Sequence, residues 1–115
     1  KPSDFDVLSG DDGITQPMMA LGAKGVISVA ANGYPDLFCK MVKSMMNQDN
    51  GTALSLHYKT LKMNNLIFAD GNPAGIKCLM AYRNLCKNIL RLPLVPVNED
   101  VKRNIENEFE TIYNK

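Results

Sequence analysis

Two short apolar segments, separated by room for one short helix, constrain the fold of this chain more than any other feature. They are residues 5–9 and 25–29, and both are dense in apolar residues rather than alternating with polar ones. Strands of this kind are typical of a parallel sheet that is covered on both faces. Asp11 or Asp12 can cap a helix over residues 16–21. The pattern predicts a strand–helix–strand unit in which residues 25–29 form a fully buried strand.

The next part of the chain has helical periodicity. The apolar residues that recur at i, i+3, i+4 and i+7 after Pro35 are Phe38, Met41, Val42 and Met45. Residues 47–51 predict a turn. The apolar residues that mark the face of a following helix are Leu54, Tyr58, Leu61 and Phe68. We interpret the methionines of the first helix, Met41, Met45 and Met46, as gap-filling core residues.

The last third of the chain predicts two more helices and one extended segment. A helix from about Pro73 carries Ile76, Leu79, Met80, Cys78 and Cys86. Residues 91–96 contain two prolines, which disfavour a helix, and their apolar content predicts a buried crossing segment. Asn98 caps a final helix whose buried face is expected to hold Val101, Ile105, Phe109 and Ile112.

Two parallel strands are too few for an independent sheet. Such a pair leaves two open edges, and sheets normally have about five or six strands. Either the strand predictions are wrong and the protein is all-α, or the chain is the end of a larger α/β protein. The chain does not begin with Met and starts close to a strand, and this favours the second interpretation.

Composition narrows the function classes. The 115 residues suit one domain, and the net charge of +1 gives no steering toward nucleic acid or an anionic membrane. No apolar run approaches the roughly 20 residues of a membrane-spanning helix. Three cysteines without CxxC spacing, and a single His57 far from them, argue against a metal site and favour free buried thiols in a reducing cytoplasm. We interpret His57 as a surface or packing residue, and we predict no cofactor.

Several stretches, taken together and in this order, resemble one enzyme family. They are Leu8-Ser9-Gly10-Asp11-Asp12, residues 25–32, His57-Tyr58-Lys59, Asn72-Pro73 with Ile76-Lys77, and residues 91–96 (RLPLVP). The chain is similar to dihydrodipicolinate synthases, also called 4-hydroxy-tetrahydrodipicolinate synthases, in the N-acetylneuraminate lyase superfamily of Schiff-base aldolases. The resemblance implies a (β/α)8 TIM barrel followed by a C-terminal helical extension. Residues 1–47 would be its last two βα units, and residues 48–115 the extension.

The resemblance also implies an activity. Family members condense pyruvate with aspartate semialdehyde in lysine (diaminopimelate) biosynthesis, through a Schiff base on a lysine near the end of the sixth strand. That lysine would lie upstream of this chain, so we expect the chain to be inactive alone. Its implied partners are the missing N-terminal barrel portion and further copies in a cytoplasmic homotetramer. A sibling pyruvate-dependent aldolase and a non-catalytic helical interaction module remain alternatives.

Barrel enzymes place their chemistry at the C-terminal ends of the strands. By resemblance, Ile27 borders the pyruvate site with its backbone carbonyl. Gly10 either lets a substrate approach the backbone or simply forms a tight turn. Ser9 and Asp11 are weaker candidates for substrate binding. Asp11 and Asp12 could act as an acid–base pair, but we favour helix capping for both.

Two positions distinguish the implied substrate classes. Gly13 stands where the related N-acetylneuraminate lyases carry a glutamate, and Val29 stands where they carry a serine. Both departures argue against a sugar-acid substrate and for the dihydrodipicolinate type.

Overall fold

The computed structural model describes residues 2–114, which form two compact units, the first ending at Tyr58 and the second beginning at Lys59. The strands lie in the first unit, so the chain is α/β. In chain order the elements are β1 (Leu8–Ser9), the 3-10 helix η1 (Asp12–Ile14), α1 (Thr15–Ala20), β2 (Gly25–Val26), the 3-10 helix η2 (Ala30–Asn32), α2 (Pro35–Met46), α3 (Asn50–Leu66), α4 (Ala74–Tyr82) and α5 (Glu99–Tyr113). No helix among the described residues is both long and apolar enough to cross a membrane.

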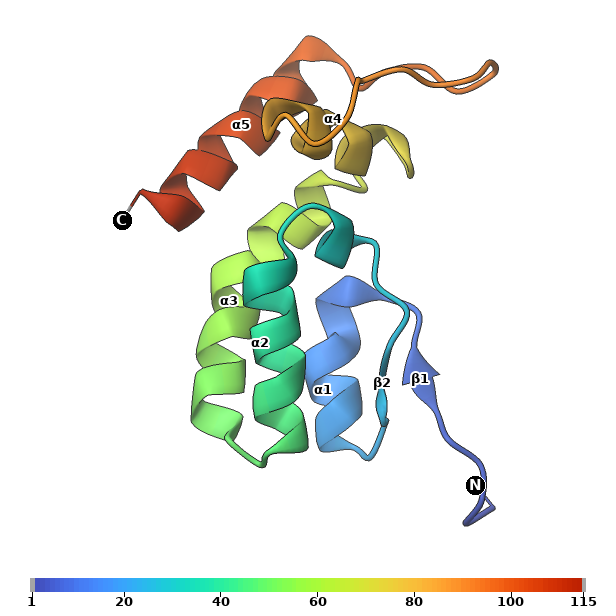
Figure 1. The fold of residues 1–115 in the computed structure, drawn as a ribbon, viewed down its shortest axis with the longest axis vertical. Coiled ribbons are helices and arrows are strands. Elements are labelled where there is room, and N and C mark those ends of the chain that lie inside the picture. Colours follow the sequence, from blue (N-terminus) through green and yellow to red (C-terminus); the bar gives the residue numbers. More distant parts are fainter. Residues whose placement is uncertain (1, 115) are drawn as a thin grey trace. The chain divides into compact units, whose positions relative to one another are not determined.

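The first unit contains the predicted strand–helix–strand motif (Figure 1). β1 and β2 pair in parallel, with Leu8 opposite Gly25 and Ser9 opposite Val26, which confirms the predicted direction. α1 connects them and ends before Gly22, whose φ of 102° is typical of a glycine that follows a helix. Beyond the strand itself, the amide of Ile27 donates to the carbonyl of Ser9 at 2.9 Å.

The prediction of two fully buried strands is wrong. Each strand has two residues, Leu8 is 49% exposed and Ile27 is 72% exposed. The physical reason is that the two strands form the whole sheet in the described part of the chain, so each keeps an edge without a neighbouring strand. The apolar density of residues 25–29 is therefore not matched by full burial among the described residues.

Helix α2 supplies much of the core of the first unit. Pro35 occupies its first turn and Asp36 adds a negative charge near its N-terminus, as the start signals predict. Tyr34 and Phe38 are buried and meet edge to face, with ring centroids 6.5 Å apart. Met41 is buried as predicted. Met46 is exposed, so the interpretation of Met46 as core is wrong.

Helix α3 begins inside the segment that was predicted as a turn, and it buries a different face from the predicted one. Asn50 and Gly51 are helical, and Phe68 lies beyond the helix end. Leu54, Tyr58 and Phe68 are exposed. The residues of α3 that are buried are Ala53, Leu56, His57, Thr60, Met63 and Asn64. The apolar pattern failed because half of the buried positions are polar.

Helices α4 and α5 pack together in the second unit. Ile76 and Leu79 of α4 and Ile105 and Ile112 of α5 are buried. The Asn98 side chain caps α5 by accepting from the amide of Val101 at 2.9 Å, which confirms the predicted cap. The other two residues predicted for the buried face of α5, Val101 and Phe109, are half-buried. Cys86 lies outside α4, contrary to the prediction.

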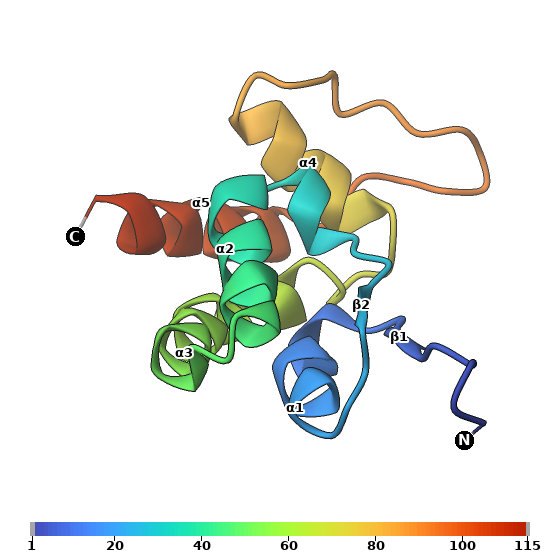
Figure 2. The ribbon, with the colours of Figure 1, turned by 60° about the horizontal axis from the view of Figure 1, so that its bottom comes forward.

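The segment between α4 and α5 is an extended loop, drawn in orange in Figure 2. The prediction that residues 91–96 are buried is wrong, because Leu92 and Val95 are 85% and 61% exposed. Of the three free cysteines, Cys78 is buried, Cys86 is half-buried and Cys39 is exposed, so the prediction of buried thiols fails for Cys39.

Candidate functional site at the strand ends

Three buried polar side chains of the first unit, those of Ser9, Asp12 and Thr15, lie near the point where the strands end. Ser9 and Gly10 lead from β1 into η1, and residues 27–29 lead from β2 into η2. Because β1 and β2 are parallel, both of their C-terminal ends lie at the same edge of the sheet. All four predicted site residues, Ile27, Gly10, Ser9 and Asp11, are therefore brought to one place.

A buried hydroxyl network fixes the end of β1. Ser9 Oγ donates to the carbonyl of Asp11 at 2.8 Å and accepts from the amide of Asp11 at 3.2 Å. Thr15 Oγ1 donates to the same carbonyl at 2.7 Å, and it lies 3.2 Å from Ser9 Oγ. Both hydroxyl side chains are fully buried. Ser9 therefore shapes the turn after β1 and does not face solvent.

The two aspartates have different roles. The exposed Asp11 caps η1, because its Oδ1 accepts from the amide of Gly13 at 2.7 Å, as predicted. Asp12 is only 2% exposed and does not cap its own helix, so that prediction is wrong. Its Oδ2 accepts from the amides of Val29 and Ala30 at 3.0 and 2.9 Å. Sequence reasoning missed this contact because the partners are backbone groups, which leave no trace in residue type.

The backbone carbonyl of Ile27 is an open acceptor. The amide of Ile27 pairs with Ser9, but the next amide donor that points from β1 toward β2, that of Asp11, turns back to Ser9 Oγ. No described residue donates to the Ile27 carbonyl. Ile27 is exposed, so its carbonyl is available to a ligand or to another segment.

Gly10 is exposed, and its surroundings separate the two explanations offered for it. A Cβ atom at this position would have no atom of the chain within 4 Å, and its φ lies outside the left-handed region. The turn itself therefore does not require glycine. Any requirement for glycine at this position must come from a group outside the chain that approaches the backbone closely.

The strand ends can bind and position a ligand, but no lysine that could form a Schiff base lies among their described residues. No described lysine follows either strand directly, and no group of three or more His, Cys, Asp or Glu residues in the described chain could hold a metal ion. His57 lies in α3, away from the strand ends, and is a packing residue as predicted. Its burial lowers its pKa, and its ring meets that of Tyr58 edge to face at 5.5 Å.

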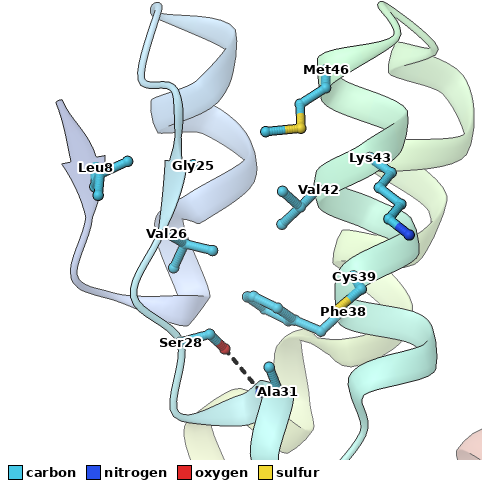
Figure 3. Close-up of a pocket in the computed structure, with 10 residues that line it drawn as sticks. All are labelled: Leu8, Gly25, Val26, Ser28, Ala31, Phe38, Cys39, Val42, Lys43 and Met46. Carbon is cyan, nitrogen blue, oxygen red and sulfur yellow. Dashed lines mark hydrogen bonds between the residues drawn. The ribbon is translucent and has the colours of Figure 1, made fainter. Parts of the chain in front are cut away.

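An apolar groove of about 490 Å³ lies between β2 and α2 (Figure 3). Val26 of β2 and Phe38, Val42 and Met46 of α2 extend into it, and Cys39 and Lys43 lie along its α2 side. The remaining lining residues are Leu8, Gly25, Ser28 and Ala31. The groove runs beside β2, whose second edge has no neighbouring strand in the described chain, so it is a surface on which another segment could pack.

These features define a class of protein: an α/β chain with parallel strands whose polar site lies at the strand ends, followed by a helical unit. The family model described as the dihydrodipicolinate synthetase family matches residues 1–112. The chain belongs to this family, which confirms the resemblance seen in its motifs.

Curated relatives support the assignment. A 4-hydroxy-tetrahydrodipicolinate synthase of Phocaeicola vulgatus is 50% identical over 96 residues, which are 84% of this chain and 32% of the relative. A synthase of the same name from Flavobacterium psychrophilum is 45% identical over 106 residues, or 92% and 36% of the two chains. This chain thus spans about a third of the length of the curated relatives it matches.

Solved structures extend the likeness to the fold. The dihydrodipicolinate synthase of Aquifex aeolicus superimposes with a TM-score of 0.89 at 36% identity, covering 97% of this chain and 38% of that one. The 4-hydroxy-tetrahydrodipicolinate synthase of Methylacidiphilum fumariolicum gives a TM-score of 0.94 at 29% identity, covering 99% and 38%.

Proposed function

We propose that this chain is the C-terminal part of a cytoplasmic Schiff-base-forming lyase. The lyase condenses pyruvate with aspartate semialdehyde in lysine (diaminopimelate) biosynthesis. The family membership and the names of the relatives support the proposal, as does the chain's coverage of about a third of each relative. The substrate class follows those names, and it agrees with Gly13 and Val29, which depart from the sugar-acid lyases.

Within that enzyme, residues 1–47 form the last two βα units of a (β/α)8 barrel and residues 48–115 form the helical extension. The unpaired edge of β2 and the apolar groove beside it support this placement, because a closed barrel has no strand edges. A strand from the missing N-terminal portion would pair with β2, and its outward side chains would fill the groove.

One observation carries the proposed role of the site: the carbonyl of Ile27 is free of donors at the end of β2. It can accept a hydrogen bond from a hydroxyl or an imine N–H of the bound pyruvate adduct without bringing in a charge. Gly10 leaves room for the substrate beside the neighbouring strand end. Ser9 and Asp11 hold the turn that follows β1 beside this site. The Schiff-base lysine lies in the missing portion, so this chain alone is inactive.

A hybrid synthase tests the proposal. In it, residues 1–112 of this chain replace the matching third of the Phocaeicola vulgatus relative. Incubation with pyruvate and borohydride should trap one pyruvate on the hybrid, and aspartate semialdehyde should be consumed together with pyruvate. The 115-residue chain alone, and the relative truncated before the replaced third, are the matched controls.

The outcomes separate the alternatives. A stoichiometric borohydride adduct on the isolated chain would contradict the assignment of the lysine to the missing portion. A hybrid that folds but traps no pyruvate would contradict the proposed function. A hybrid that traps pyruvate yet prefers another aldehyde acceptor would indicate the sibling aldolase.

The loop between α4 and α5 favours self-association as a second role of the chain. Its exposed apolar residues are Leu85, Ile89, Leu92, Leu94 and Val95. Several large exposed apolar residues in one loop are typical of sites of protein contact. We expect the hybrid to form homo-oligomers, as tetramers, and sedimentation velocity measures this directly. Association of the isolated chain, with an inactive and monomeric hybrid, would instead support the non-catalytic interaction module.

A further inference from the structure

Asp12 is an acidic side chain that is buried without a basic partner. It is 2% exposed, and it accepts hydrogen bonds from two backbone amides, those of Val29 and Ala30. Its other oxygen, Oδ1, is buried and has no hydrogen-bond partner in the described chain. Burying a carboxylate is costly, and its retention at a site is explained when it performs a specific task.

The two amides that bind Asp12 belong to the segment that follows the free carbonyl. On the N-terminal side of Ile27, one hydrogen bond fixes the backbone: the Ile27 amide donates to the Ser9 carbonyl at 2.9 Å. On its C-terminal side, the amide of Val29 donates to Asp12 Oδ2 at 3.0 Å. The peptide group that carries the Ile27 carbonyl lies between these two hydrogen bonds. Without the hydrogen bond from Val29 to Asp12, this peptide could rotate, because β2 itself ends at Val26.

The Asp12 contact also joins the two strand ends. Asp12 follows β1, whereas Val29 and Ala30 follow β2, and the bonds therefore span 17 and 18 residues. Bonds from a charged acceptor are shorter and roughly twice as strong as neutral ones. The end of β2 is thus held by the same turn that the Ser9 and Thr15 hydroxyls make rigid.

We propose that Asp12 is a positioning residue for the lyase reaction: through Val29 and Ala30 it fixes the direction of the Ile27 carbonyl toward bound pyruvate. This inference rests on the proposed function. Asp12 touches no reacting atom in it. Loss of Asp12 should weaken the binding of pyruvate. A residue that only stabilises the fold would change the melting temperature and leave pyruvate binding unchanged.

Two substitutions in the hybrid synthase test this role. Asp12→Ala removes the acceptor, and we expect the pyruvate concentration that gives half-maximal borohydride trapping to rise about tenfold, the equivalent of one hydrogen bond. Asp12→Asn keeps one neutral acceptor oxygen of nearly the same shape, and we expect a rise of about threefold. The KM for pyruvate should follow the same order.

A matched control uses another aspartate that binds a backbone amide. Asp49 is exposed and accepts from the amide of Thr52 at 3.1 Å at the start of α3, away from the strand ends. Asp49→Ala should lower the melting temperature of the hybrid but leave half-saturation by pyruvate unchanged.

The outcomes distinguish this inference from the function on which it rests. A wild-type hybrid that traps no pyruvate refutes the proposed function. An active hybrid whose Asp12→Asn and Asp12→Ala variants keep the wild-type pyruvate half-saturation, even with lower melting temperatures, overturns the positioning role. If Asp12→Ala does not fold, Asp12→Asn decides alone, since unchanged half-saturation in that variant has the same meaning.

Discussion

Gly75 shows how one residue can set the distance between two segments. It lies in the first turn of α4, and its backbone approaches the end of α3 at Ile67. A Cβ atom built at this position would lie 2.7 Å from Ile67 Cα and closer still to the Ile67 carbonyl oxygen. The obstacle is backbone rather than a flexible side chain, so the clash cannot be relieved by a change of rotamer.

We therefore predict that Gly75→Ala destabilises the hybrid synthase by roughly 1–3 kcal/mol, the usual range for overpacking. Urea unfolding measures the change. The control is Gly51→Ala in the first turn of α3, where the nearest atom would lie 3.9 Å from the new Cβ. There, alanine should be neutral or stabilise by up to about 1 kcal/mol. Equal effects of the two substitutions would show that close approach is not the cause.

His57 predicts a dependence of stability on pH. Burial lowers its pKa from the ordinary value of 6.5, so the folded protein binds the proton less readily than the unfolded chain. The free energy of unfolding should therefore fall as the pH drops below about 6.5, until the folded-state pKa is also passed. Above that window, His57 is neutral in both states and adds no slope.

The measurement is urea unfolding of the hybrid and of its His57→Gln variant between about pH 5 and pH 7.5. Carboxylates and other histidines titrate in both proteins, so the difference between the two curves isolates His57. As the pH falls, the free energy of unfolding should decrease more for the hybrid with His57 than for the His57→Gln variant. A difference that is independent of pH would contradict the prediction.

At the scale of elements, α5 is held in place by its first residues. Asn98 Oδ1 accepts from the amide of Val101, while both the amide and the side-chain Nδ2 of Asn98 donate to Asp70 Oδ2, at 2.8 and 2.7 Å. One side chain thus caps the helix and ties it to the segment between α3 and α4.

Asn98→Ala should lower the free energy of unfolding by about 0.5–2 kcal/mol, the range for loss of a helix cap. Asn107→Ala, an exposed change in the interior of the same helix, should be neutral or slightly stabilising, because alanine favours helix more than asparagine. Thermal and urea unfolding of both variants check this. The interpretation fails if the two substitutions cost the same.

The contrast between α5 and α3 explains how far the sequence predicts this fold. α2 and α5 were predicted well because each has a start signal and an apolar stripe that matches its buried face. The buried face of α3 includes His57, Thr60 and Asn64, so the positions of its apolar residues indicated the wrong side. The strands were predicted as too long and too buried because apolar density was read as full burial, whereas Leu8 and Ile27 are exposed among the described residues.

The candidate site was predicted in part for a similar reason. Parallel strands carry their C-terminal ends to one edge, so the strand predictions brought Gly10 and Ile27 together, while the resemblance to the family singled out Ile27. The capping role of Asp11 followed from its place before a helix. The contact of Asp12 could not be predicted, because any residue type offers the same amide that Val29 and Ala30 offer.

At the scale of the whole molecule, the exposed groove between β2 and α2 predicts that cysteine reactivity differs between this chain and a complete barrel. Cys39 is exposed and lines the groove, whereas Cys78 is buried in the second unit. Burial also raises the pKa of Cys78, with Glu106 adding to the effect, so its reactive thiolate is scarce. The two thiols should therefore report separately on the groove and on the fold.

We predict that iodoacetamide alkylates Cys39 of the isolated chain quickly and Cys78 slowly, as peptide mass spectrometry measures for each site. If the proposed barrel is right, a further strand beside β2 would cover the groove in the hybrid synthase, so alkylation of Cys39 should slow by about tenfold or more while Cys78 stays slow. Cys78 serves as the internal control, because rapid alkylation at that site would show that the protein had unfolded. Equal rates at Cys39 in both folded proteins would contradict the pairing of a further strand beside β2. The groove would then be a surface for a partner outside the barrel.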